Sequence, residues 1–415
     1  MQATVDTYRR VIALTGPALP VLSFLARLPV AMAQFGSVLL VAATSGSLAT
    51  AGIVGGTLSA GQVVCGPLLG RLADRRGQRP VVLAAASVNA LATAGLVTGA
   101  LAGLGTVPLA AVGALTGASV PLIGPLARTR SVALAHRAQA DESVVAAVHS
   151  LEGTLDEVSF VIGPALVGLA ALVAHPAVAL GGAAALVAVF GTAFALHPTA
   201  AVTAGQHGAG RKRKARERKA RRAGRHPAVV YSVRGSLALQ GAMFGGCQAG
   251  IAALTERLGV PGQAGIVYAA MGVVSAGVGL ALGALPARYG LRLRWRAATA
   301  AALVLSVPLL FTDGLWALYA VVTVLGAAYA PHLITAFALT ERAVAPDRLA
   351  EAMAFAASSL VAGQAVALAV SGRLAQWYGP AGAFAVAVGA AAAALGLALC
   401  TRVPATRTHR PAAHT

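Results

Sequence analysis

The sequence contains a series of apolar stretches, each about as long as a helix that crosses a lipid bilayer. A bilayer core of about 30 Å requires roughly 20 apolar residues in a helix. Windows of this size fall near residues 18–42, 47–69, 80–104, 107–129, 146–172 and 176–197, and again near 229–254, 262–285, 296–312, 315–340, 350–376 and 379–401. The pattern predicts an all-α membrane protein with twelve spans in two sets of six.

The composition agrees with a chain that lies mostly in lipid. Hydrophobic residues make up 57% of the sequence, charged residues make up 11%, and the mean hydropathy is +0.76. Soluble domains carry about 25% charged residues. The three cysteines (Cys65, Cys247 and Cys400) lie far apart in or beside apolar windows, without a disulfide or metal-binding pattern. We therefore expect no metal site and no cofactor. No signal-peptide cleavage site follows the first apolar residues, so the first helix is expected to be retained.

The formal net charge of +19 would suit a nucleic-acid-binding protein until the cations are placed along the chain. With the N-terminus in the cytoplasm, 28 of the 32 Lys and Arg residues fall in segments on the cytoplasmic side. The run RKRKARERKARRAGR at 211–225 has no aromatic residues to stack on bases, so it is predicted to be a solvated linker with some attraction to anionic lipid. We expect a multi-pass protein of the cell membrane (the inner or plasma membrane), with both termini cytoplasmic and no nucleic-acid partner.

The two sets of spans are copies of one unit. A shift of 213 residues aligns AGIV at 51–54 with AGIV at 264–267 and gives 11 identities over positions 51–79. Shifts of 210 and 209 align Pro121 with Pro331 and Glu142 with Glu351. Because six spans precede the second copy, both copies have the same orientation. The predicted organisation is an N-terminal six-helix bundle (1–197), a basic cytoplasmic linker (198–227), a C-terminal six-helix bundle (228–402) and a cytoplasmic tail (403–415).

The loop after the second window reads GRLADRRGQRPVVL at 70–83. It resembles the signature loop of the major facilitator superfamily (MFS) in seven residues: Gly70, Leu72, Ala73, Asp74, Arg75, Gly77 and Arg79. Gln78 departs from the pattern at a usually basic position. The resemblance implies the MFS fold, with twelve helices in two six-helix pseudo-repeats, and a cytoplasmic gate formed by Gly70, Asp74, Arg75, Gly77 and Arg79.

The Asp74 carboxylate is expected to accept hydrogen bonds from Arg75 or Arg79, or to lie at the N-terminus of a neighbouring helix, where the helix dipole favours an anion. Gly70 is expected to allow close approach of helices, and Gly77 a positive φ. In the second copy of the repeat Ala287 replaces Asp74, so that copy is expected to gate weakly.

The fifth window carries three acids, Glu152, Asp156 and Glu157, one third to one half of the way along. An acid at this depth costs several kcal/mol unless it is paired, hydrated or protonated, so it indicates a functional site. Glu152 and Asp156 are four residues apart and share a helix face. Arg27, inside the first window, is the candidate partner. Proton or cation coupling through these four residues and purely structural pairing both remain open.

The same window continues to Gly163, Pro164 and Gly168, with serines at 150 and 159. This resembles in part the antiporter motif of MFS exporters, in which small residues allow close packing and the proline kinks the helix. Exporters of the family usually carry an arginine inside the fourth helix. Here Arg128 is placed only at the cytoplasmic end of the fourth window, and Arg27 is the expected substitute.

Five further polar residues are candidates for the substrate cavity, because helices 1, 4, 7 and 10 line it in the family: Gln34, Gln240, Gln248, Tyr329 and His332. Each of them is equally a candidate for hydrogen bonding between helices. His332 is also a possible proton site, because the reference pKa of histidine is about 6.5.

The absence of a GxxxxGK[ST] motif and of a nucleophile–base arrangement argues against an enzyme. The resemblance implies a bacterial drug or metabolite exporter that exchanges a small organic molecule for protons between its two halves. We expect the substrate, protons and the lipid bilayer to be its only partners and the chain to act as a monomer. Proton-coupled uptake of a nutrient, and a membrane sensor or scaffold that transports nothing, are the alternatives.

Overall fold

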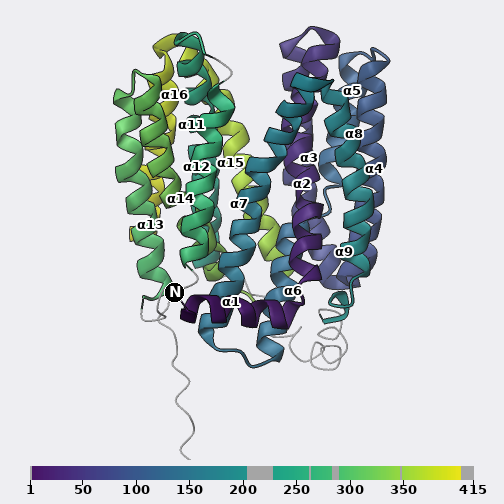
Figure 1. The fold of residues 1–415 in the computed structure, drawn as a ribbon, viewed down its shortest axis with the longest axis vertical. Helices are drawn as coiled ribbons and strands as arrows, with labels where there is room; N and C mark the ends of the chain where they lie inside the picture. The colour runs from purple at the N-terminus through teal and green to yellow at the C-terminus, as the bar shows by residue number, and fades with distance from the viewer. Residues whose placement is uncertain (1, 203–227, 261–262, 283–288, 346–347, 403–415) are drawn as a thin grey trace, which may run out of the picture.

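The computed structural model describes the chain except for residues 1, 203–227, 261–262, 283–288, 346–347 and 403–415. The predicted tail, most of the predicted linker, and Ala287 lie outside the described residues. The helices form two groups that stand side by side (Figure 1). The N-terminal half contains α2 to α9, and the C-terminal half contains α11 to α16.

Twelve spans in the described part of the chain are long and apolar enough to cross a membrane, which confirms the predicted all-α fold. In chain order the elements are α1 (Gln2–Thr15), α2 (Ala18–Ser45), α3 (Leu48–Arg76), α4 (Gln78–Leu101), α5 (Thr106–Ala118), α6 (Ile123–Arg137), α7 (Glu142–Val173), α8 (Pro176–Leu186), η1 (Val187–Gly191), α9 (Thr192–Leu196), α11 (Ala228–Arg257), α12 (Ala264–Leu282), α13 (Leu291–Ser306), η4 (Val307–Phe311), α14 (Leu315–Ala343), α15 (Leu349–Tyr378) and α16 (Pro380–Cys400).

No helix was expected before residue 18, yet α1 forms there as a separate amphipathic helix. It ends at Thr15 and is followed by Gly16, whose φ of 71° is readily adopted only by glycine, and by Pro17. The helix lies across one end of the molecule, beneath the spans (Figure 1). We call this the α1 end and the other the opposite end.

The fourth span is broken into α5 and α6, and the break sets the direction of α6. Pro121 lacks the N–H that would continue the helix, and Leu122 adopts a left-handed conformation with φ 52° and ψ 37°. A residue of this type in that region costs about 1–3 kcal/mol and persists only where its surroundings hold it. Leu122 is buried in the core of the N-terminal half beside Leu126. Arg128 is thereby carried on a helix that starts inside the bundle.

The two halves meet mainly along two helix pairs, α3 with α15 and α7 with α12, with smaller contacts between α7 and α14 and between α6 and α15. A Cβ atom on Gly66 would lie 2.6 Å from Ser358 Oγ, and one on Gly279 would lie 2.9 Å from Thr154 Oγ1. Gly66 and Gly279 are aligned by the shift of 213 residues, so each copy of the repeat uses the same glycine to approach the other half.

The molecule is closed at the α1 end. Among the described residues, every glycine contact, hydrogen bond and ion pair between the halves lies between that end and the middle of α12, where Gly272 meets Val161. Toward the opposite end the two groups of helices diverge (Figure 1). A closed α1 end with diverging helices beyond it is one of the two forms that an alternating-access transporter adopts.

Candidate functional site

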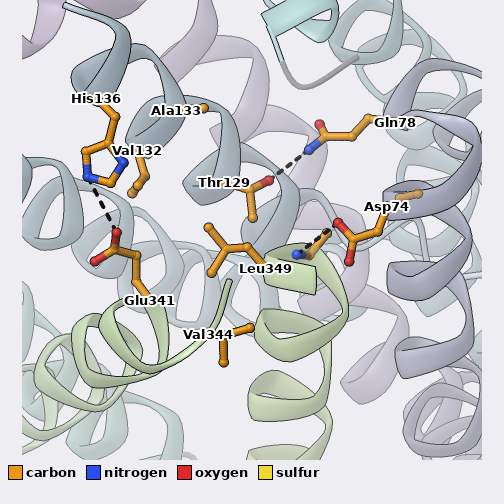
Figure 2. A pocket seen from close by; sticks show the side chains of 11 residues that line it. Asp74, Gln78, Thr129, Val132, Ala133, His136, Glu341, Val344 and Leu349 are labelled. Atoms are coloured by element: carbon orange, nitrogen blue, oxygen red, sulfur yellow. Dashed lines mark hydrogen bonds and ion pairs between the residues drawn. The ribbon is translucent and has the colours of Figure 1, made fainter. Parts of the chain in front are cut away.

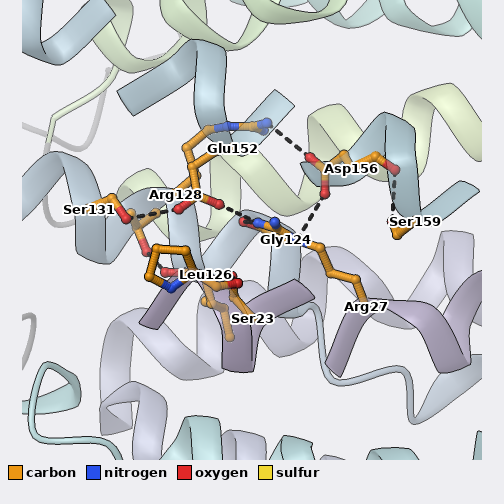
Figure 3. A network of polar contacts seen from close by, with 11 residues as sticks. Ser23, Arg27, Gly124, Leu126, Arg128, Ser131, Glu152, Asp156 and Ser159 are labelled. Carbon is orange, nitrogen blue, oxygen red and sulfur yellow. Dashed lines mark hydrogen bonds and ion pairs between the residues drawn. The ribbon is translucent and has the colours of Figure 1, made fainter. Parts of the chain in front are cut away.

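Four charged side chains form a network between α2, α6 and α7 of the N-terminal half (Figure 3). Arg27 of α2 binds Glu152 of α7 through Nη2 and lies 3.0 Å from Asp156 Oδ1 through Nε. Arg128 of α6 donates from Nη2 to Asp156 Oδ2 at 2.9 Å. The two positive and two negative charges of this network therefore sum to zero. Burial of one of these charges without its partners would cost several kcal/mol.

The residues that surround this network fix its geometry. Ser131 of α6 donates to Glu152 Oε1 at 2.8 Å and so occupies that carboxylate's second oxygen. A Cβ atom on Gly124 would lie 2.6 Å from Asp156 Oδ1, so only glycine leaves room for the Asp156 carboxylate against α6. The Phe337 ring of α14 lies 3.8 Å from the Arg128 guanidinium carbon. A residue of the C-terminal half therefore covers a cation of the N-terminal half.

The placement of Arg128 at the end of the fourth span was wrong. Its side chain is fully buried, nine residues before the end of α6, and it shares Asp156 with Arg27. Arg130 is equally buried, and the 28 cations that the sequence assigns to the cytoplasmic side include both residues. Arg27 therefore does not substitute for an arginine of the fourth span; the chain contains both.

Glu157 lies apart from the network although it is adjacent to Asp156 in sequence. It is 7% exposed, and its Oε1 atom has no hydrogen-bond partner among the described residues. Its side chain bonds to Ser275 on α12, and its electrostatic neighbours are the adjacent Asp156 together with Tyr268 on α12 and Tyr329 on α14. The three acids predicted as one group are thus two sites, a neutralised pair and one acid at the contact between the halves.

The loop residue Asp74 lies at the N-terminus of α15. Its Oδ1 accepts from Ala350 N at 3.2 Å, and its Oδ2 accepts from Glu351 N at 2.7 Å. Of the two predicted arrangements, the helix N-terminus is therefore present. The first N–H groups of a helix have no partner within the helix, and the dipole there favours an anion. Asp74 supplies that anion from the other half.

Other residues of the loop support this contact. Arg71 donates to Glu351 Oε1 through Nη2 at 2.6 Å and through Nε at 3.0 Å. A Cβ atom on Gly70 would lie 2.7 Å from Ala354 Cβ, so the predicted close approach is present. Gly77 has the expected positive φ, at 88°. Arg75 and Arg79 are exposed.

The structure explains why glutamine occupies position 78, where the family pattern has a basic residue. Its side chain points into the N-terminal half, where its Oε1 accepts from Arg130 Nε at 2.6 Å and its Nε2 donates to Thr129 Oγ1 at 2.8 Å. Arg130 also donates to the Phe194 carbonyl at 2.7 Å. A basic residue at position 78 would place a second cation against this buried arginine.

A cluster of titratable groups that the sequence did not suggest lies beside this contact. Glu341 of α14 lies 3.5 Å from His136 Nε2 of α6 and 3.9 Å from His149 Nε2 of α7. A small cavity of about 60 Å³ adjoins it, lined in part by Asp74, Gln78, Thr129, His136 and Glu341 (Figure 2). The cavity lies between the halves at the α1 end and is too small for an organic substrate.

The five predicted cavity residues form hydrogen bonds between helices of one half. Gln34 donates to Gln62 at 2.8 Å, Gln240 donates to the Tyr329 carbonyl at 2.8 Å, and Gln364 lies 3.5 Å from Gln248. His332 lies 2.7 Å from Ser236, and the Tyr329 hydroxyl lies 3.5 Å from Cys247. Gln34 and Gln248 are partly exposed, whereas Gln240, Tyr329 and His332 are buried. Their roles toward a substrate stay predictions.

The sequence matches the family model of the Major Facilitator Superfamily over residues 19–315. The chain belongs to this superfamily. The fold is similar to that of the human organic anion transporter MFSD10 (TETRAN), with a TM-score of 0.69, 17% identity and coverage of 94% of this chain and 99% of that one. A search of curated proteins finds no match.

A bacterial homologue of the iron transporter ferroportin is also similar in fold. Its outward-facing structure with soaked iron gives a TM-score of 0.65 at 16% identity. Its outward-facing structure without soaked iron gives 0.68 at 14% identity, and in both cases the match covers 92% of this chain and 97% of the other. At these identities the similarity is one of fold alone.

The MFS antiporter-like motif is only partly supported by the packing of α7. A Cβ atom on Gly163 would lie 2.6 Å from Ala31 Cβ, so this glycine lets α7 approach α2 closely. Around Gly168 there is open space, so packing gives no reason for that glycine. Pro164 lies inside α7, which continues to Val173.

Proposed function

We propose that this MFS transporter exports a small organic molecule in exchange for protons, and that Glu157 is the residue that carries the proton. The supporting observation is the contrast along α7. Glu152 and Asp156 are each paired with arginine, whereas Glu157 is buried without a cation among the described residues. Burial without a cation favours the neutral form of a carboxyl group. Glu157 can therefore hold a proton while it is buried and release that proton when water reaches it.

The position of Glu157 ties its proton to the conformational change. The acid lies on α7, which packs against α12 and α14, and it bonds to Ser275 of α12, so it lies at a contact that must separate when the α1 end opens. A neutral Glu157 can remain in the closed contact, and an ionised one is stable only where water reaches it. The Arg27–Glu152–Asp156–Arg128 network remains balanced throughout and holds α2, α6 and α7 together.

The α1 end is proposed to face the cytoplasm, so that the structure is outward-facing. Without Arg128 and Arg130 the count of cations on that side falls to 26 of 32, still a large excess. The two halves are proposed to rock about the site between them. Boundaries near 197, 228 and 402 for the halves, the linker and the tail are part of this proposal.

The test uses proteoliposomes with a pH indicator inside, to which compounds of several classes (organic anions, organic cations and neutral amphiphiles) are added. A transported compound should move protons in the opposite direction. Glu157→Gln should abolish this proton movement but retain exchange of labelled compound at equal concentrations, which needs no net proton transfer. The matched control is Glu256→Gln, at an exposed acid near the opposite end, and it should behave as the wild type.

Three results would contradict the proposal. Full proton movement in Glu157→Gln would place the coupling group elsewhere, with Asp156, Glu152 and His332 the next candidates. Proton movement in the same direction as the compound would indicate uptake by symport. A folded protein that moves none of the compounds, yet still binds partners, would favour the sensor.

A further inference from the structure

The helix α1 is attached to the N-terminal half. Val11 on its inner face is buried against Val132 of α6 and against Val144 and Val148 of α7. Its outer face carries exposed Arg9 and Arg10, and Arg10 lies 3.8 Å from Asp141 before α7. When the halves move, α1 is therefore expected to travel with α6 and α7.

One residue of α1 reaches the other half. The Tyr8 hydroxyl donates to the backbone carbonyl of Leu280 at 2.6 Å and lies 3.0 Å from Ser150 Oγ of α7. A phenol has one proton, so the bond to Leu280 uses it. Ser150 in turn donates to the adjacent carbonyl of Gly279. Two hydroxyl groups of the N-terminal half thus bind two consecutive carbonyls of α12.

These carbonyls lie near the α1 end of α12. The described part of α12 reaches Leu282, so Gly279 and Leu280 lie within its last four described residues. A backbone carbonyl has two lone pairs, so it can accept a hydrogen bond from a side chain beside any bond within its own helix. Tyr8 and Ser150 supply such donors.

The contact is the counterpart of the one at Asp74, with the polarity reversed. There an acid of the N-terminal half binds free N–H groups at the start of α15. Here hydroxyl donors bind two carbonyls of α12. The second copy of the loop motif lacks the acid, with Ala287 in place of Asp74. The Tyr8 and Ser150 bonds provide a separate contact on the α12 side.

We propose that α1 and Ser150 form a second latch, which closes the α1 end by donating hydrogen bonds to the Gly279 and Leu280 carbonyls of α12 and releases it when the halves separate. Burial raises the pKa of the Tyr8 phenol, so it remains a donor at physiological pH. This latch acts on the opening of the α1 end, whichever substrate or coupling ion the transporter uses.

The test measures the opening of the α1 end directly. Spin labels at Ala138→Cys and Arg292→Cys, two exposed sites on opposite halves, report the separation of the halves by pulsed EPR in a background without native cysteines. Tyr8→Phe removes only the hydroxyl group and should raise the ratio of open to closed molecules about threefold to tenfold. Ser150→Ala should do the same. The matched control, Tyr378→Phe at an exposed tyrosine of the opposite end, should leave the distances unchanged.

Asp74→Asn serves as the positive control for opening, and thermal melting in detergent verifies that each variant is folded. If Tyr8→Phe and Ser150→Ala keep the wild-type distances while Asp74→Asn opens the α1 end, the latch does not exist. If Tyr8→Phe unfolds, Ser150→Ala decides the question by the same distances. These outcomes are separate from the proton movement of Glu157→Gln, so either proposal can fail alone.

Discussion

At the scale of single residues, the network around Asp156 is a balance of four charges with little surplus hydrogen bonding. Arg128 has buried Nε and Nη1 atoms without hydrogen-bond partners among the described residues, and its main support is the Asp156 carboxylate. A buried pair of this kind contributes modestly when intact, but loss of one partner leaves an uncompensated charge. The structure therefore predicts that single substitutions are worse than matched double ones.

Arg128→Met should destabilise the protein by about 3–5 kcal/mol, because the carboxylates of Glu152 and Asp156 would share one arginine in place of two. Arg128→Met combined with Asp156→Asn should be less destabilised, since it removes one charge of each sign. Melting temperatures in detergent measure both, with Arg402→Met, at an exposed residue, as the control. A double variant that melts at or below the temperature of the single variant would contradict the charge-balance argument.

Gln78 and Arg130 allow a second test at this scale. Gln78→Arg restores the basic residue of the family motif, yet it should lower the melting temperature, because it directs a cation toward the fully buried Arg130. Addition of Arg130→Gln to that variant should recover part of the loss by exchanging the two partners. The exposed neighbour Arg79, changed to Gln, is the control. Equal melting of Gln78→Arg and wild type would show that the position tolerates a cation.

At the scale of elements, backbone groups of helices hold the two halves together. The start of α15 presents N–H groups that its own helix leaves unpaired, and Asp74 of the N-terminal half accepts from them. The Gly279 and Leu280 carbonyls of α12 accept from Ser150 and Tyr8. Such bonds form in one conformation and break in the other without a change in secondary structure. N–H groups require an acceptor such as an acid, and carbonyls require donors such as hydroxyl groups.

Asp74→Asn should therefore weaken closure of the α1 end. The carboxylate accepts two backbone N–H bonds, and charge-assisted bonds are worth about 1.5–3 kcal/mol, whereas an amide keeps one oxygen and loses the charge. We expect a shift toward the open form by about tenfold and slowed turnover, with substrate affinity retained. Transport kinetics and EPR distances measure these effects. Asp6→Asn, on the exposed face of α1, is the control, and unchanged turnover in Asp74→Asn would refute a gating role.

At the scale of the whole molecule, the sequence was sufficient to predict those features that the thickness and apolarity of the bilayer determine. Window length gave all twelve spans, and the signature loop led to Gly70, Asp74 and Gly77. It failed where a residue's environment depends on distant segments. The pairing of Arg71 with Glu351 joins residues 280 positions apart, and the burial of Arg128 depends on the break at Leu122. Hydropathy windows also pass over α1, which is amphipathic and lies across the bundle end.

The orientation of the whole molecule gives the last prediction. If the α1 end is cytoplasmic, a cysteine at Ala138, in the exposed segment between α6 and α7, should resist an impermeant thiol reagent in intact cells. A cysteine at Asp313, which is exposed at the opposite end between η4 and α14, should react. Both positions should react after permeabilisation, which controls for accessibility. The reverse labelling pattern would overturn the orientation and make this conformation inward-facing. The Tyr8 latch would then close the outer side, and Glu157 would load its proton from the cytoplasm.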